Sequence, residues 1–236
     1  HYLLNGAKTW ISNAPFADIA VVWAKDENGR IHGLIVERGM EGFSTPTTHN
    51  KWSLRASATG ELIFDNVKIP KENLLPNKSG LGAPLMCLDS ARFGIAWGAI
   101  GAAMDCYDTA LRYAKEREQF GKPIAAFQGI QFKLADMNTE LVAARQMVRL
   151  AAFKLDSQDP DASTYCAMAK RFATDIGYQV CDEALQCFGG NGYIKEFPME
   201  RYLRDSRVHR ILEGTNEIMR VIIARRILLA DHQAIL

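Results

Sequence analysis

The sequence lacks the spaced motifs that mark the commonest nucleotide and metal sites. No GxGxxG follows a strand-like run and no GxxxxGK[ST] is present, which argues against a Rossmann or P-loop nucleotide site. The five histidines are scattered, with no HxxxH spacing and no grouping with cysteine. We therefore expect no metal site.

Cysteine is scarce and irregularly placed. The five cysteines are odd in number, form no CxxC pair and lie in apolar stretches with helical spacing: Cys87, Cys106, Cys166, Cys181 and Cys187. This pattern predicts reduced core thiols in an intracellular protein rather than a disulfide framework.

A charge excess and a long apolar run are also missing. The formal net charge is +1, so a nucleic acid partner has no bulk electrostatic support. No apolar run approaches the roughly 20 residues that cross a bilayer, and no signal-peptide pattern opens the chain. We expect neither nucleic acid binding nor membrane insertion.

The first third of the chain has the punctuation of a β domain. The 236 residues are 48% hydrophobic and 23% charged, which fits one large domain or two modest ones. β-branched runs at 18–23 and 33–37 flank Asp26-Glu27-Asn28-Gly29, a strong hairpin turn. A further strand pair is expected at 61–65 and 67–69, broken at Asn66.

The N-terminal side of this β domain is expected to be missing. The strands are too few to close a barrel, and His1 is an unusual first residue.

Long helices follow the β region. Apolar and small residues recur at helical spacing in three long runs and two shorter ones: 86–119, 127–155, 162–188, 199–210 and 218–229. Long antiparallel helices with short connections form a bundle. The sequence therefore predicts an α+β fold, with a partial antiparallel β-barrel or sheet domain at 1–77 and an antiparallel four-helix-bundle domain at 78–236.

Four segments lie at breaks between these elements, where functional residues concentrate. They are Lys8 to Pro15, Arg117 to Pro123, Gln186 to Tyr193 and Leu212 to Glu217. Each segment alone also fits a structural interpretation: a turn with an aromatic plug, a helix end closed by glycine and proline, a glycine-rich helix stop, and a helix N-cap.

Glu213 is a carboxylate at the last of these breaks. Gly214 permits an unusual backbone angle, and Thr215 can cap the helix that follows. The helix dipole favours the charged form of a carboxyl at this place, whereas burial favours the neutral form. A base poised between these effects is useful in catalysis, and a solvated one is a surface residue.

Together and in order, the four segments resemble the acyl-CoA dehydrogenase family. The resemblance runs from Tyr2 to about Ala230 and lacks the family's N-terminal helical domain and the first part of its β domain. The segments resemble its flavin-contacting strand and loop (Tyr2 to Asn13), its R-x-x-F-G dinucleotide contact (Arg117 to Gly121), a second dinucleotide contact (Gln186, Gly189 and Gly190) and the E-G-T of its catalytic base (Glu213 to Thr215).

The resemblance implies an FAD enzyme that converts an acyl-CoA thioester into its α,β-enoyl product. The residues that would hold FAD are Trp10, Ser12, Arg117, Gln119, Phe120, Gln128, Gln186, Gly190, Thr215 and Glu217. Those from the two dinucleotide contacts would reach FAD across a subunit boundary. Three residues would border the acyl-CoA: Asp89, Arg92 and Gly214. For Arg92, a structural ion pair and a ligand contact are both open.

The resemblance also implies that Glu213 takes the α-proton of the substrate. A minority of family members carry the base on the first bundle helix, at the position of Ala91 here, and alanine cannot serve. Glu217, one helical turn further on, is the rival carboxylate and is expected to face the flavin or solvent. The N–H of Glu213 would donate to the thioester oxygen.

Within the family the strongest likeness is to glutaryl-CoA dehydrogenases. It rests on the segments 16–24, 52–60 and 91–98. Glutaryl-type enzymes usually have tyrosine before the catalytic glutamate, and Leu212 stands there instead. The 210–220 segment is more similar to short-chain and branched-chain members. Glutaryl-CoA is therefore the first-choice substrate, and a butyryl- or isobutyryl-type acyl-CoA is the alternative.

The family implies electron-transfer flavoprotein as the electron acceptor and a homotetramer built as a dimer of dimers. It implies a cytoplasmic location in a bacterium and a mitochondrial matrix location in a eukaryote. A chain that lacks one wall of the acyl pocket could instead be a non-catalytic oligomerisation scaffold. An oxidase that uses oxygen is a third alternative that the spacing leaves open.

Overall fold

The computed structural model describes residues 1–229, which form two compact units, His1–Cys87 and a second unit that begins at Leu88. Residues 230–236, including Ala230 and His232, lie outside the described residues. The expected α+β class, with antiparallel sheets before a helical bundle, is confirmed. The boundary expected after residue 77 stays a prediction.

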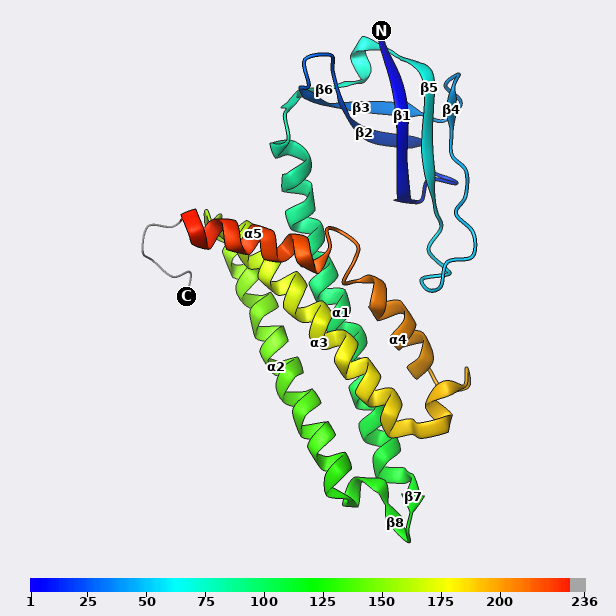
Figure 1. Ribbon diagram of the computed structural model, residues 1–236, viewed down its shortest axis with the longest axis vertical. Coiled ribbons are helices and arrows are strands. Elements are labelled where there is room, and N and C mark those ends of the chain that lie inside the picture. Colours follow the sequence, from blue (N-terminus) through cyan, green and yellow to red (C-terminus); the bar gives the residue numbers. More distant parts are fainter. Residues whose placement is uncertain (230–236) are drawn as a thin grey trace. The chain divides into compact units, whose positions relative to one another are not determined.

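The first unit contains two antiparallel sheets (Figure 1). One has the order β1-β5-β4, made of Tyr2–Ser12, Thr59–Ile69 and Phe43–Ser44. The other has the order β2-β3-β6, made of Ile19–Lys25, Ile31–Glu37 and Leu74–Ser79. A short 3₁₀ helix, Lys71–Asn73, precedes β6. The core between these strands is mostly aliphatic, with Val36, Val67 and Ile69 completely buried, and it includes Phe64 stacked on Phe43.

The hairpin turn between β2 and β3 forms at the expected place. The Gly29 N–H donates to the Asp26 carbonyl, and the Asp26 carboxylate accepts the N–H groups of Asn28 and Arg30 at 2.9 and 2.8 Å. This side chain satisfies the turn backbone, which is the usual role of aspartate at such positions.

The expected break at Asn66 is wrong. Residues 59–69 form one continuous strand that pairs with β1, and the two halves do not pair with each other. Asn66 has a φ of 51°, and its N–H donates to Asn5 Oδ1 at 2.8 Å. Asparagine tolerates the left-handed region, so the irregularity is absorbed inside the strand.

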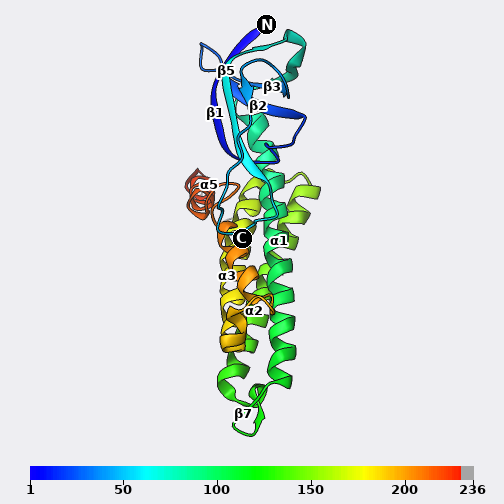
Figure 2. The ribbon, with the colours of Figure 1, turned by 90° about the vertical axis from the view of Figure 1, so that its right-hand side faces the viewer.

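The second unit is helical. The long helices α1 (Gly82–Glu116), α2 (Gln128–Asp156) and α3 (Ala162–Phe188) run side by side (Figures 1 and 2). α4 (Met199–Val208) lies along α3, and α5 (Asn216–Leu229) crosses it near its N-terminal part. At the other end of the bundle lie a hairpin (β7, Glu118–Gln119, and β8, Lys122–Pro123) and two 3₁₀ turns (Ile124–Ala126 and Gly189–Tyr193).

Small side chains let the long helices approach closely. Ala96, Ala103, Ala110 and Ala114 of α1 are completely buried, and so are Ala167, Ala169 and Ala184 of α3. All five cysteines are free, as expected, but Cys87 is exposed, so the expectation that it is a core thiol is wrong. No helix of residues 1–229 is long and apolar enough to cross a membrane.

Candidate active site

The connection between α4 and α5 holds Glu213 in a strained backbone conformation. Glu213 has a φ of 57° and Gly214 a φ of 89°, so two successive residues occupy the left-handed region. Glycine adopts this region freely, but a residue with a side chain pays on the order of 1–2 kcal/mol. Such strain persists only where the surroundings impose it, and it clusters at functional sites.

Arg92 of α1 is the first of two cations that hold this turn. Its Nε donates to the Glu213 carbonyl at 3.4 Å, and its Nη1 pairs with Asp89 at 2.8 Å. Asp89 Oδ1 also accepts the Ser163 hydroxyl at 2.9 Å. The Arg92 side chain is 4% exposed, so its charge is held inside the protein by these contacts. The ion pair expected as one alternative for Arg92 is present, and the contact with the acyl-CoA stays a prediction.

Lys170 of α3 is the second cation, and it is completely buried. Its Nζ donates to the Gly214 carbonyl at 2.8 Å and to Asn216 Oδ1 at 3.0 Å. Burial lowers the pKa of Lys170 from 10.5 to about 8, because desolvation disfavours the ammonium. The nearby Asp175 opposes this effect and Arg92 adds to it.

Asn216, the first residue of α5, connects this turn to α3. Its Nδ2 donates to Thr174 Oγ1 and to Asp175 Oδ1, each at 3.0 Å. Asp175 in turn pairs with Arg210 at 2.8 Å. The buried side chain of Asn216 thus has all its polar atoms in contact with α3, which satisfies it and fixes where α5 begins.

Thr215 and Glu217 behave as a helix start. Thr215 Oγ1 accepts the Ile218 N–H at 3.3 Å, which is the expected N-cap. The Glu217 side chain is 80% exposed, and its pKa is lowered by its own backbone N–H and by the Thr215 hydroxyl. Glu217 is therefore a solvated carboxylate, whereas Glu213 is partly buried.

A cleft of about 780 Å³ lies at the opposite end of the helical unit. It brings together six of the residues that sequence reasoning placed in dinucleotide contacts: Arg117, Gln119, Phe120, Gln186, Gly189 and Gly190. Lys133, which pairs with Glu183, also lines it, and no motif pointed to that lysine. Gln128 is the first residue of α2 and is not among the lining residues, although its neighbours Phe127 and Gly129 are.

Phe120 stands at the tip of the β7–β8 hairpin. Phe120 and Gly121 have φ values of 54° and 77°, the pair of positive angles that a two-residue turn of this kind requires. The Phe120 side chain is 92% exposed and contacts Phe127 edge-on. An aromatic residue that has a strained backbone and a solvent-exposed ring is suited to contact a flat ligand.

The glycine-rich turn after α3 closes the cleft. Gly189 has a φ of 56°, and the Asn191 amide donates to the Tyr113 hydroxyl at 2.8 Å. A Cβ on Gly192 would lie 2.7 Å from the Leu185 carbonyl oxygen, so no other residue fits there. Gly189 and Gly190 are exposed and line the cleft together with Arg117, a combination that suits a phosphate-bearing ligand.

Trp10 and Ser12 belong to the first unit and lie at the end of β1. A register shift between Lys8 and Ile11 places Trp10 at a bulge, with a φ of 59° and 73% of its surface exposed. Bulges re-aim side chains next to functional sites. Ser12 is also exposed. The roles expected for both residues stay predictions.

Within the helical unit the expected site residues fall into two groups, not one. Lys170, beside the Glu213 turn, and Gln186, in the cleft, are sixteen residues apart on α3, about 24 Å along a helix. Lys170 and Asn216 were missed by sequence reasoning. A signal existed for Lys170, since the residues three and four positions away on both sides are small: Cys166, Ala167, Ala173 and Thr174. Among residues 1–229, no three His, Cys, Asp or Glu side chains gather as a metal site would require.

Family models match most of the chain. The C-terminal domain of acyl-CoA dehydrogenase matches residues 78–228, and the middle domain matches residues 1–67. Among similar proteins, the mitochondrial isobutyryl-CoA dehydrogenase of Dictyostelium discoideum is 42% identical over 98% of this chain and 57% of its own length. A subunit of the caffeyl-CoA reductase–Etf complex of Acetobacterium woodii is 42% identical over 97% of this chain and 61% of its own length.

Solved structures show the same architecture. Butyryl-CoA dehydrogenase of Megasphaera elsdenii has a TM-score of 0.90 and 41% identity, over 96% of this chain and 60% of that one. A glutaryl-CoA dehydrogenase of Mycobacterium smegmatis in complex with FADH2 has a TM-score of 0.91 and 35% identity, over 98% and 60%. The chain thus spans about three fifths of the length of the curated relatives that it matches.

Proposed function

The chain belongs to the acyl-CoA dehydrogenase family, and we propose that its full protein uses FAD to convert an acyl-CoA thioester into an α,β-enoyl-CoA. The observation that carries this proposal is the Glu213–Gly214 turn. A carboxylate stands there in a left-handed conformation, and two buried cations from different helices hold the two successive carbonyls of the turn.

The reaction requires a base in a fixed position. The α-C–H of a thioester is a weak acid, so proton removal needs a held carboxylate and a polarised carbonyl. Glu213 takes the α-proton on its carboxylate, and its N–H donates to the thioester oxygen. Glu217 does not compete as the base, because its side chain is solvated and its pKa is lowered. Bound FAD supplies the hydride acceptor for the β-carbon.

The residues present fit FAD at both of its ends. The cleft offers the guanidinium of Arg117, exposed glycine backbone and the Phe120 ring, which suit the pyrophosphate and adenosine part. Trp10 offers a flat exposed ring for the isoalloxazine, and Ser12 offers a hydroxyl for its polar atoms. Thr215 and Glu217 complete the cofactor contacts expected beside the base.

Two copies of the chain are needed for one FAD in this proposal. The cleft lies about 24 Å from the Glu213 turn along α3, so we assign it to the FAD of a partner subunit. This arrangement supports a homo-oligomer, and the family pattern is a homotetramer. A relative named as part of an Etf complex supports electron-transfer flavoprotein as the electron acceptor.

The acyl group is the open part of the proposal. Relatives and solved structures named for isobutyryl-, butyryl- and glutaryl-CoA are 35–42% identical to the chain, which favours none of them. The 16–24, 52–60 and 91–98 segments support glutaryl-CoA, and Leu212 supports a short or branched acyl group. We propose a short acyl-CoA, with glutaryl-CoA and butyryl- or isobutyryl-CoA as the two classes to separate.

The test is an anaerobic titration of the full-length protein, followed by flavin absorbance. We expect a yellow protein whose absorbance is bleached by one of glutaryl-, butyryl- or isobutyryl-CoA. With glutaryl-CoA as substrate, product analysis then distinguishes crotonyl-CoA, which requires decarboxylation, from glutaconyl-CoA, which does not. A colourless protein that takes up no added FAD would support the scaffold alternative, and hydrogen peroxide release on substrate addition would support the oxidase.

A further inference from the structure

Lys170 is a buried cation whose hydrogen-bond acceptors are both neutral. The Gly214 carbonyl and the Asn216 amide oxygen accept hydrogen bonds from its ammonium group. Lys170 takes part in none of the ion pairs found among residues 1–229. A buried ammonium without a paired carboxylate costs folding free energy. An apolar side chain of the same length would avoid the cost of the charge, but it would leave the Gly214 carbonyl and the Asn216 amide oxygen without this donor. The two acceptors on the turn, not the filling of space on α3, therefore account for the ammonium.

The two acceptors of Lys170 lie on either side of the cap of α5. Gly214 directly follows Glu213, and Asn216 is the first residue of the helix, with Thr215 between them. Lys170 therefore ties both ends of this short segment to one point on α3. The contact at 2.8 Å is shorter than the 3.4 Å contact by which Arg92 reaches the Glu213 carbonyl. Of the two cations, Lys170 makes the stronger hydrogen bond to the turn.

We propose that Lys170 is a positioning residue of the reaction, which holds the Glu213–Gly214 turn in its left-handed conformation through the Gly214 carbonyl and the Asn216 side chain. Arg92 fixes the preceding carbonyl from α1, so the two cations clamp the turn from two helices. Without Lys170 the backbone relaxes from its strained angles, and the Glu213 carboxylate moves relative to the substrate. The expected effect of Lys170 on the reaction rate rests on the proposed function, whereas its effect on the conformation of the turn rests on geometry alone.

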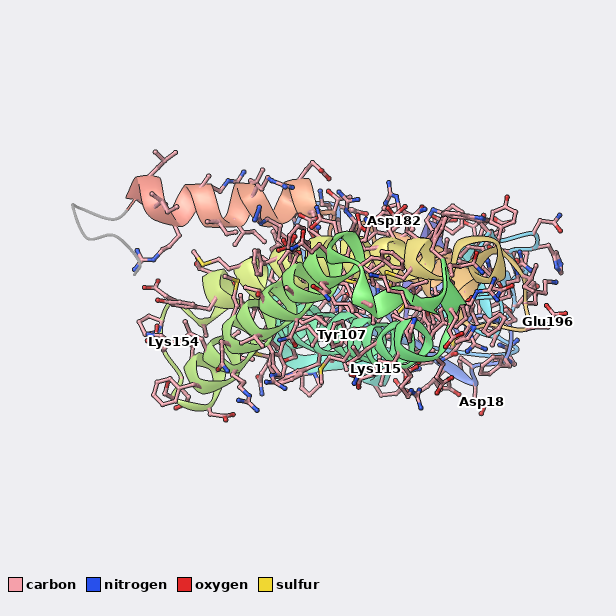
Figure 3. The ribbon with its side chains drawn as sticks, turned by 90° about the horizontal axis from the view of Figure 1, so that it is seen from below. Asp18, Tyr107, Lys115, Lys154, Asp182 and Glu196 are labelled. Carbon is pink, nitrogen blue, oxygen red and sulfur yellow. The ribbon has the colours of Figure 1, made fainter. Side chains whose placement is uncertain are left out.

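The test compares Lys170→Met with Lys154→Met in the full-length holoprotein. Methionine fills a similar volume but donates no hydrogen bond. Lys154 pairs with Asp159 at 2.7 Å near the C-terminal end of α2, and its side chain is labelled in Figure 3. That pair is outside both groups of site residues, so Lys154→Met controls for the loss of a partly buried lysine contact.

We expect Lys170→Met to retain FAD and to bind enoyl-CoA with a dissociation constant within about threefold of the wild-type value. In stopped flow, its flavin should be reduced by substrate about 100-fold more slowly than that of the wild type. A misplacement of about 1 Å can cost this much. Lys154→Met should match the wild type within about twofold. Hydrogen exchange of residues 211–217 should be faster in Lys170→Met than in the wild type and unchanged in Lys154→Met.

The proposal is overturned if Lys170→Met reduces its flavin at the wild-type rate, or if residues 211–217 keep their wild-type protection. If Lys170→Met does not fold, Lys170→Gln, which keeps a donor on a shorter chain, is measured in the same way. It should reduce its flavin more slowly than the wild type, by less than about 100-fold. Failure of both variants to fold would assign Lys170 to stability and refute a positioning role. A yellow wild type that no acyl-CoA reduces would refute the proposed function instead, while hydrogen exchange would still decide the role of Lys170.

Discussion

The buried ammonium of Lys170 predicts an unusual dependence of stability on pH. Burial lowers the pKa of Lys170 to about 8 in the folded protein, against 10.5 for an exposed lysine. Between these two values the unfolded chain holds a proton that the folded chain has released. The free energy of unfolding therefore rises with pH in this window, because the unfolded state binds more protons. The cost of the buried charge is complete below pH 8 and disappears above pH 10.5.

The magnitude follows from the two pKa values. Each tenfold difference in proton affinity is about 1.4 kcal/mol, so charged Lys170 destabilises the folded state by about 3 kcal/mol at pH 7.5. At pH 9.5 the folded chain is mostly neutral at Lys170 and the unfolded chain is mostly charged, so the destabilisation falls to about 1.4 kcal/mol. Between pH 7.5 and pH 9.5, the free energy of unfolding of the wild type should thus rise by about 2 kcal/mol because of this residue. The titratable and charged groups that face Lys170 are Arg92 of α1, Asp175 of α3, His209 and Glu213 of the α4–α5 connection, and Glu217 of α5.

The assay is urea unfolding of the wild type and of Lys170→Met at pH 7.5 and 9.5. Subtracting the Lys170→Met value removes the contributions of other titrating groups, so the difference between the two proteins isolates Lys170. We expect this difference to shift by about 2 kcal/mol in favour of the wild type at pH 9.5. A difference that stays constant within about 0.5 kcal/mol would refute the account of Lys170 as a desolvated cation.

Three further predictions concern the two groups of site residues. Gly192→Ala should lower the free energy of unfolding by about 1–3 kcal/mol and weaken FAD retention, because the new Cβ meets the Leu185 carbonyl at 2.7 Å. Gly101→Ala is the control in the same urea assay. Since Gly101 lies in open space on α1, this substitution should raise the free energy of unfolding by up to about 1 kcal/mol. Phe120→Ala should lose FAD on gel filtration without a lower unfolding free energy, because the side chain is 92% exposed, and equal FAD retention would contradict its role. Thr215→Ala should destabilise by about 1 kcal/mol through loss of the α5 cap, Thr215→Ser should not, and equal melting of both variants would show that the cap is idle.

Periodicity predicted the helices well and the long strand poorly. The bounds expected for α3 are those observed, because apolar and small residues recur along its whole length between a proline-containing loop and two glycines. The break expected at Asn66 is wrong because asparagine has two structural uses. It ends strands in turns, and it also bends a continuous strand when its left-handed backbone is supported by a partner such as Asn5.

The candidate site was predictable where residue type and conformation agree. Gly214 predicts a residue in the left-handed region and Thr215 predicts a helix cap, and the structure contains both. The left-handed angle of Glu213 itself was not predictable, because a residue with a side chain carries no local preference for it and only tertiary contacts impose it. Lys170 was missed for the same reason, since lysine is expected at the surface and its buried acceptors come from residues more than 40 positions away.

The most direct test of the central claim is the anaerobic bleaching of bound flavin by acyl-CoA in full-length Glu213→Gln. Glutamine keeps the shape of the side chain but cannot take the α-proton, so we predict a yellow variant that binds the acyl-CoA and whose flavin stays oxidised, while the wild type is bleached. Undiminished bleaching of the Glu213→Gln flavin would contradict the assignment of Glu213 as the base.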